Sequence, residues 1–281
     1  MARGAGAYWY DAGHGFLLAV PSHHVLVPDP ASLRTLLWHS RCVGARFSAP
    51  LDGPGKLSYQ IVCDDREYAL EKLSANTRSK VRRGLRRCTV RRVAMADVAA
   101  HGRVADRDTL LRQGRSWRWS EEPAWTQYWQ AAATTPGIEA WGAFVDDTLA
   151  AFLVTVRFED CVEFLLARSR SDARDAYPNN ALIYTVTQEL LVQRGVRRIT
   201  FARVARGGAG ARRVQVRDGI LADPLRQRVV FHPIAGAVLR RCVVRSAIHQ
   251  LAAGRRGARG GFWRKAEGVH RFAEEGGLEV L

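Results

Sequence analysis

The stretch that decides the fold reads IEAWGAF (138–144), LAAFLVTVR (149–157), CVEFLLA (161–167), PNNALIYTVTQELLVQR (178–194) and ITF (199–201). The first three runs are strand-like, and the acidic pairs Asp146-Asp147 and Glu159-Asp160 between them predict the turns of a three-stranded antiparallel meander. Pro178 at the start of the fourth run and Gly195 after its end are typical of a well-bounded helix. The order therefore predicts meander, loop, helix and strand in an α/β (α+β) fold with a mixed sheet.

A second distinctive stretch lies upstream, where RSKVRRGLRR (78–87) predicts a helix capped by Asn76 or Thr77. Three arginines follow one another at helical spacing on this segment: Arg78, Arg82 and Arg86. Like charges at this spacing destabilise an isolated helix, so we expect bound phosphate, with Arg83 contributing, to offset the repulsion. A solvated basic face is an equally good interpretation of the same pattern.

The composition is that of a globular protein with a strongly basic surface. The chain has 281 residues and 43 Lys plus Arg against 27 Asp plus Glu, which gives a formal net charge of +16. Such a charge favours polyanionic ligands, although part of the arginine excess is also typical of a GC-rich genome. No apolar run approaches the roughly 20 residues of a membrane-spanning helix. The first ten residues do not resemble a secretory signal, so we expect a cytoplasmic protein.

The cysteines and histidines give no indication of a metal centre. Five cysteines are scattered singly, without C-x-x-C pairs or zinc-type spacing, and we expect them to be reduced thiols. His23 and His24 are adjacent, so on a strand they would point to opposite faces. We therefore expect no metal site.

Two passages, 73–92 and 141–233, resemble the GNAT acyltransferase superfamily, in its Fem-like and BioF2-like branch. The motifs that carry the resemblance are AFVDDTLAAF (143–152), YPNNALIY (177–184), GVRRITF (195–201) and VRDGILADPLRQRV (216–229). The resemblance implies two GNAT-type halves: a reduced one over 1–95, and an acyltransferase domain with a basic, Gly-rich tail over 96–281. The chain departs from the family because Q/R-x-x-G-x-G/A is absent before Ala181, and Val216-Arg217 stands where an aromatic-Lys pair is common.

The resemblance also implies where a donor would bind. In GNAT-type sites two central strands splay apart, and the N-terminus of the following helix faces the pyrophosphate of the donor. In this chain the corresponding residues would be Arg170, Arg174, Asn179 and Asn180. The alternative is that Asn179 only caps the helix and that the two arginines are solvated.

Acyl transfer to an amine needs a route for the amine proton and a proton for the leaving group. Glu163, on the strand nearest the expected site, is the candidate base, unless it is merely an exposed strand residue. Tyr177 and Tyr184 are candidate proton donors, unless they serve only in packing.

Three functions remain open at this stage. The first is an N-acyltransferase that uses an acyl-CoA thioester and a small-molecule or peptide amine acceptor. The second is a Fem-like transferase that takes an aminoacyl group from aminoacyl-tRNA, with the tRNA backbone on Arg78–Arg87 and on the tail 240–265. The third is a non-enzymatic nucleic-acid-binding protein, although no readout motif is recognisable.

Overall fold

A computed structural model describes residues 2–11, 15–114, 121–204 and 220–239, together with 268 and 279–280. The chain forms two compact units. One consists of Ile61–Ala202 and Val214–Ala222, and the other of Met1–Gln60, Arg203–Arg213 and Asp223–Leu281. The boundary that we expect near residue 95 lies within the first unit, and the assignment of two GNAT-type halves stays a prediction. The basic tail 240–265 and Val216-Arg217 lie outside the described residues.

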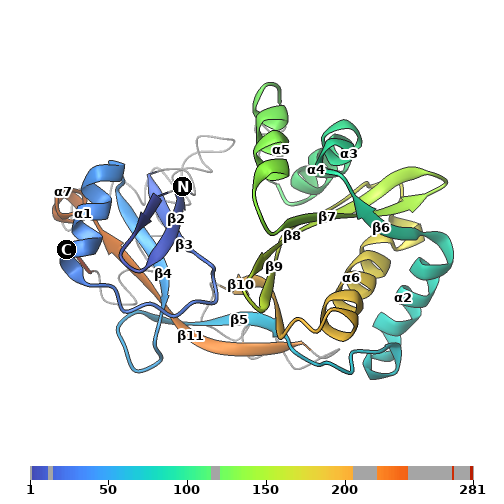
Figure 1. The fold of residues 1–281 in the computed structure, drawn as a ribbon, viewed down its shortest axis with the longest axis horizontal. Helices are drawn as coiled ribbons and strands as arrows, with labels where there is room; N and C mark the ends of the chain where they lie inside the picture. The colour runs from blue at the N-terminus through green and yellow to red at the C-terminus, as the bar shows by residue number, and fades with distance from the viewer. Residues whose placement is uncertain are drawn as a thin grey trace. The chain divides into compact units, whose positions relative to one another are not determined.

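The first unit is built on the predicted meander. Its strands are β6 (Thr89–Val93), β7 (Ile138–Val145), β8 (Thr148–Phe158), β9 (Cys161–Ser169) and β10 (Arg198–Val204), adjacent in that order. Neighbouring strands are antiparallel from β6 to β9, and β10 lies parallel to β9. The antiparallel meander and the mixed sheet are therefore confirmed (Figure 1).

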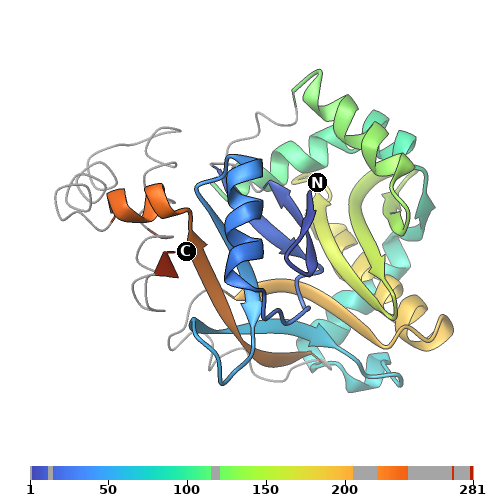
Figure 2. The same cartoon turned by 60° about the vertical axis from the view of Figure 1, so that its left-hand side comes forward.

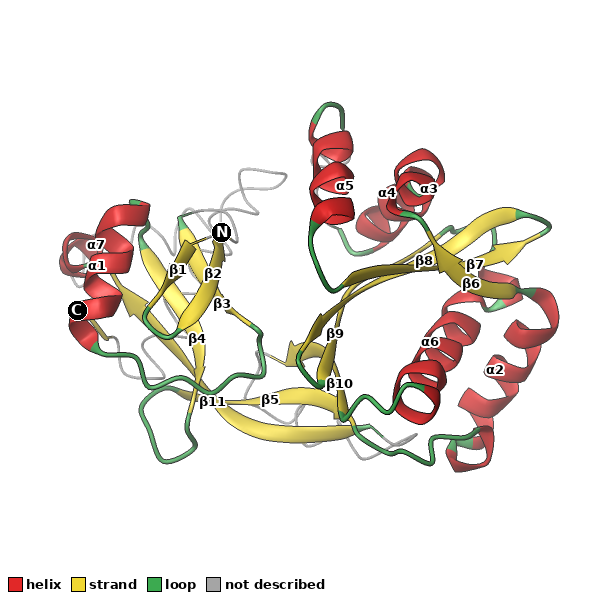
Figure 3. Ribbon diagram, in the orientation of Figure 1, coloured by secondary structure: helices red, strands yellow, loops and turns green. Residues whose placement is uncertain are grey.

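Helices cover both faces of this sheet (Figure 3). One face carries α2 (Ala75–Arg87) and α6 (Pro178–Gln188), and the other carries α3 (Met95–His101), α4 (Arg103–Arg112) and α5 (Ala124–Thr134). Strand β8 shows the consequence, because Leu153 packs beneath α6 while Phe152 and Val154 pack on the opposite side. Trp125 and Trp129 of α5 are each only 1% exposed, so they are core residues.

The parallel pair β9–β10 is hydrogen-bonded only at its beginning. The ladder joins Cys161, Val162 and Glu163 to Arg198, Ile199 and Thr200, although both strands continue beyond these residues. On its other edge β9 has a bulge, since Val154 faces Leu166 while Thr155 faces Phe164. Leu165 is thus outside the ladder, and the regular alternation of side chains along this strand is interrupted there. The strands part just after Glu163, as the GNAT resemblance implies.

The second unit contains a sheet in the order β1 (Ala2–Gly4), β2 (Ala7–Asp11), β3 (Phe16–Val20), β4 (Gly44–Ala49) and β11 (Leu221–Phe231). Helix α1 (Pro30–Ser40) lies against it and contributes Leu33 and Leu37 to the core around Trp9 and Phe47 (Figure 2). Helix α7 (Pro233–Leu239) and strand β12 (Glu279–Val280) follow β11, and β5 (Lys56–Cys63) spans the boundary between the units. Residues 25–27 form no strand, and Val25 alone makes an isolated bridge, to Ser48.

Among the described residues, every helix is too short or too polar to span a lipid bilayer. The four described cysteines are free thiols, and three of them are buried. Burial raises the pKa of the Cys63 thiol to about 11, so it is protonated at neutral pH. These thiols therefore behave as core side chains.

A buried ion pair fixes α4 to β9. The Nε of Arg168 lies 2.6 Å from Oδ1 of Asp106, whose side chain is completely buried, while that of Arg168 is 9% exposed. Removing one partner of such a pair leaves the other charge buried without compensation, which costs far more than removing both.

Replacing Asp106 alone should therefore be much more harmful than replacing the pair. We expect Asp106→Ala to lower the free energy of unfolding by about 3–5 kcal/mol, and Asp106→Leu combined with Arg168→Met to recover most of that loss. Urea-induced unfolding followed by circular dichroism measures both variants. Equal losses in the single and the double variant would contradict this account of the pair.

Candidate anion-binding site

The N-terminus of α6 begins with an unusual backbone arrangement. The short 3₁₀ helix η3 (Arg174–Ala176) leads into Tyr177, which has a left-handed conformation with φ of 54°. The Tyr177 carbonyl accepts hydrogen bonds from the N–H groups of Asn180 (3.1 Å) and Ala181 (3.2 Å). Pro178 has no N–H group, so only the N–H of Asn179 is left without such a bond in the first turn.

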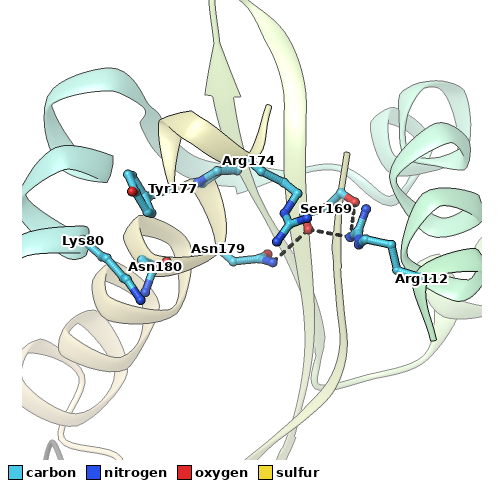
Figure 4. Close-up of a pocket in the computed structure, with 8 residues that line it drawn as sticks. Lys80, Arg112, Ser169, Arg174, Tyr177, Asn179 and Asn180 are labelled. Atoms are coloured by element: carbon cyan, nitrogen blue, oxygen red, sulfur yellow. Dashed lines mark hydrogen bonds between the residues drawn. The ribbon is translucent and has the colours of Figure 1, made fainter. Parts of the chain in front are cut away.

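A pocket of about 360 Å³ lies at this helix end. Its lining residues come from α2, α4, the end of β9 and the turn before α6, and they are Lys80, Arg112, Ser169, Arg174, Tyr177, Pro178, Asn179 and Asn180. Figure 4 shows the side chains of Lys80 and Arg174 reaching towards the first turn of α6 from different elements. All of these residues belong to the first unit.

The pocket carries three cationic side chains and no carboxylate. Within the described part of the chain, Lys80, Arg112 and Arg174 form no ion pair. The helix dipole adds a partial positive charge at the same place. The pocket is therefore suited to an anionic ligand with more than one negative charge.

Hydrogen bonds hold the wall of the pocket in place. Ser169 is 4% exposed, and its Oγ accepts from Asn179 Nδ2 at 2.9 Å and from Arg112 Nη2 at 3.1 Å. Arg112 Nη2 also donates to the Ser169 carbonyl at 2.8 Å, and the Ser169 N–H donates to Thr109 Oγ1 at 2.9 Å. The Oδ1 atom of Asn179 is buried and has no hydrogen-bond partner among the described residues. A ligand with a hydrogen-bond donor would satisfy that atom.

Helix α2 lies against the same helix end, because Gly84 faces α6. A Cβ atom at Gly84 would lie 2.8 Å from the Tyr177 carbonyl oxygen and 3.0 Å from Cβ of Ala181, so only glycine allows this approach. The Arg83 guanidinium lies 5.9 Å from the centre of the Tyr177 ring, and Arg87 Nη1 donates to the Asp175 carbonyl at 2.8 Å. The basic helix and the N-terminus of α6 thus form one electropositive region.

Not all residues predicted from the sequence meet in this pocket. Arg174, Tyr177, Asn179 and Asn180 line it. Arg170 does not, because its guanidinium makes a bidentate pair with Asp172 at 3.0 and 2.7 Å. This pair lowers the pKa of Asp172 and raises that of Arg170.

The predicted arginine row of α2 lies outside the pocket lining. Arg82, Arg83 and Arg86 are exposed, while Arg78 is half-buried and donates to the Glu71 carbonyl at 3.3 Å. The helix begins at Ala75 with Ser74 as its N-cap residue, one turn earlier than the predicted start. Arg82 and Arg86 are therefore accessible to a large anionic ligand, whereas Arg78 is only partly so. The role of this row in phosphate binding stays a prediction.

Glu163 and Tyr184 also lie away from the pocket lining. Glu163 is half-buried on β9, in register with Thr200, at the point where β9 and β10 part. Tyr184 is 6% exposed and packs on Tyr68 with ring centres 5.6 Å apart. Burial, with a smaller contribution from Glu71, raises the pKa of Tyr184.

Lys80, Arg112 and Ser169 line the pocket but are not among the predicted site residues. Lys80 stands four positions before Gly84 on the same helix, so both lie on the face that meets α6. The glycine in an otherwise basic helix was the available signal for that face. Arg112 and Ser169 meet only through the packing of α4 on β9, which the sequence does not reveal.

The raised pKa of Tyr184 predicts how stability responds to high pH. Since the folded chain holds this proton more tightly than the unfolded chain, the contribution is complete below about pH 10 and is lost as the pH rises further. We expect Tyr184→Phe to flatten the decline of the melting temperature above about pH 10. An unchanged slope in differential scanning fluorimetry would contradict this assignment.

The close contact at Gly84 predicts that a larger side chain at this position lowers the stability of the fold. We expect Gly84→Val to lower the free energy of unfolding by about 1–3 kcal/mol, because the new side chain must push α2 away from the Tyr177 carbonyl. Ser79→Val, at an exposed position of the same helix, serves as the matched control and should cost much less. Chemical denaturation of both variants makes the comparison, and a similar loss in each would argue against the contact.

Comparison with known proteins agrees with this architecture. Residues 75–212 match the family of acetyltransferase (GNAT) domains. No curated protein sequence matches the chain significantly. The fold is similar to that of FemX, with a TM-score of 0.51 and 11% identity over 77% of this chain and 82% of that one.

Two further structures share the fold over most of their length. L-PGS from Bacillus licheniformis has a TM-score of 0.51 and 11% identity, over 88% of this chain and 85% of that one. The C-terminal domain of a candidate lysylphosphatidylglycerol synthetase from Agrobacterium fabrum has a TM-score of 0.52 and 16% identity, over 89% and 87%. The match to the acetyltransferase (GNAT) domain over residues 75–212, together with the meander and the parting parallel strands, shows that this chain has the GNAT fold, which it shares with these structures.

Proposed function

We propose that this protein is an N-acyltransferase that transfers an acyl group from an acyl-CoA thioester to an amine. The observation that carries the proposal is the cation-lined pocket at the start of α6, next to the strand edge that opens after Glu163. The pocket would hold the phosphates of the donor. The pyrophosphate of CoA carries charge complementary to Lys80, Arg112 and Arg174.

The open edge of β9 supports a donor with a long arm. From Phe164 to Leu166 this edge has no ladder partner in β10, so its outward backbone groups could form hydrogen bonds with amides of the donor. The Ser169 backbone groups at the end of the edge are already bonded to Thr109 and Arg112. Glu163 and Ser169 are six positions apart, which corresponds to about 20 Å along a strand. A donor with its phosphate at Ser169 therefore reaches Glu163 only if its acyl group lies far from its phosphates, as in acyl-CoA.

The proposed reaction uses Glu163 as the base. The amine nitrogen attacks the thioester carbonyl, and the carbon–sulfur bond breaks when the tetrahedral intermediate collapses. Glu163 accepts the proton that the attacking nitrogen loses, and the thiolate leaves with CoA. Because Val162 packs beneath α6, Glu163 points to the opposite face of the sheet, which is where the amine would approach.

Aminoacyl-tRNA is the second candidate donor. Its acyl group is esterified to the terminal ribose, close to the last phosphate, so the reacting carbon would lie near the pocket and near the Tyr177 hydroxyl. Tyr177 would then protonate the leaving ribose hydroxyl. The observation that favours this donor is the exposed row Arg82, Arg83 and Arg86 on α2, beside the pocket, where it could contact further phosphates.

Binding experiments distinguish the two donors. We expect acetyl-CoA to raise the melting temperature of the protein, with affinity that depends weakly on salt, because CoA presents few phosphates. Arg174→Ala should weaken acetyl-CoA binding roughly 10- to 100-fold, as expected for loss of a charged hydrogen bond. Arg82→Glu should leave acetyl-CoA binding nearly intact. If bulk tRNA binds with a steep salt dependence that Arg82→Glu reduces, and acetyl-CoA does not bind, the second donor replaces the first.

Kinetics provide the matching test of the catalytic residues. With acyl-CoA as donor, Glu163→Gln should reduce kcat by about 10²–10⁴-fold with little change in KM, since it removes a base and not a binding group. Tyr177→Phe should have the larger effect on kcat if the donor is aminoacyl-tRNA. Full activity of Glu163→Gln with acyl-CoA would exclude this glutamate as the base.

A further inference from the structure

We infer that Lys80 is a specificity-determining residue: helix α2 supplies it to the pocket, and it makes the site select a diphosphate over a single phosphate. The inference deepens the proposed function and rests on it, because it concerns the phosphate end of the same donor. It does not depend on which acyl group is transferred.

Few backbone N–H groups are available to an anion at this helix end. Anion sites at helix N-termini usually use several N–H groups of the first turn. In this chain the N–H groups of Asn180 and Ala181 are bonded to the Tyr177 carbonyl, and Pro178 has none. Side chains must therefore provide most of the hydrogen bonds to an anion in this pocket.

The three cationic side chains reach the pocket from different elements. Arg174 belongs to the turn before α6, and Arg112 reaches the pocket from α4, where Ser169 and Ser171 hold its guanidinium. Lys80 comes from α2 and extends towards Asn180 (Figure 4). Cations that converge from three separate elements match an extended, multiply charged group better than a single phosphate.

Helix geometry places Lys80, and not one of its arginine neighbours, in this pocket. Residues four apart lie on the same face of a helix, so Lys80 shares the face of Gly84, which contacts the Tyr177 carbonyl and Ala181. Arg82, Arg83 and Arg86 are exposed on other parts of α2. The close packing at Gly84 thus directs the Lys80 ammonium into the pocket. Lysine acts there as a compact charge with three donors.

Isothermal titration calorimetry with inorganic pyrophosphate and inorganic phosphate tests the inference directly. We expect the wild-type protein to bind pyrophosphate at least 10-fold more tightly than phosphate. Lys80→Ala should weaken pyrophosphate binding at least 10-fold and change phosphate binding less than about 3-fold, while Lys80→Arg should retain most of the preference. Arg91→Ala, which removes one exposed charge from β6 outside the pocket, is the matched control.

Three results would overturn the inference: a preference that Lys80→Ala leaves unchanged, a loss in Arg91→Ala as large as that in Lys80→Ala, or a wild-type protein without the preference. Thermal unfolding verifies that each variant is folded. Steady-state kinetics with acetyl-CoA separates this question from the proposed function. A higher KM with unchanged kcat in Lys80→Ala supports both, whereas Lys80-dependent pyrophosphate binding without any acetyl transfer refutes only the acyl-CoA transferase.

Discussion

The contact between α2 and α6 at Gly84 is the constraint on which the electropositive region depends. Without a side chain at this position, the two helices approach until backbone meets backbone at the Tyr177 carbonyl. The arginines of α2 repel one another, and this repulsion would destabilise α2 as an isolated helix. In the folded chain the same arginines also lie near the positive N-terminus of α6. The stability that offsets this repulsion comes from packing, since Val81 and Leu73 join the apolar core beneath the sheet. The apolar packing of the core thus offsets the electrostatic repulsion that arises when positive charge is concentrated in one region.

The central architecture could be predicted from the sequence because its signals are local. The acidic turns at Asp146-Asp147 and Glu159-Asp160, and the punctuation of α6 by Pro178, each act within a few residues. Strands β1, β2 and β4 were not predicted. Strands β1 and β2 pair with each other across a tight turn, but they are only three and five residues long. Strand β4 depends on a distant partner, since it pairs with β11. The bulge at Leu165 was missed for the same reason, because it is set by the register with β8.

The candidate site could be predicted only in its contiguous part. The turn before α6 brings Arg174, Tyr177 and Asn179 together because they are close in sequence. Arg112 and Ser169 meet across 57 positions, through the buried pair of Asp106 with Arg168 and the bonds of Thr109. Arg170 has the charge and the sequence position expected of a pocket residue, but its guanidinium is paired with Asp172 and does not line the pocket. Charge and spacing alone do not identify which cation keeps its charge available to a ligand.

The use of side chains in place of main-chain amides has a consequence for the history of such a site. An anion-binding site formed by main-chain N–H groups is largely independent of side-chain identity, so point mutations alter it little. A pocket that depends on Lys80, Arg112 and Arg174 can change its preferred ligand through single codon changes, while the scaffold around it stays intact. With the proposed donor in this pocket, substitutions would therefore change donor choice more readily than architecture.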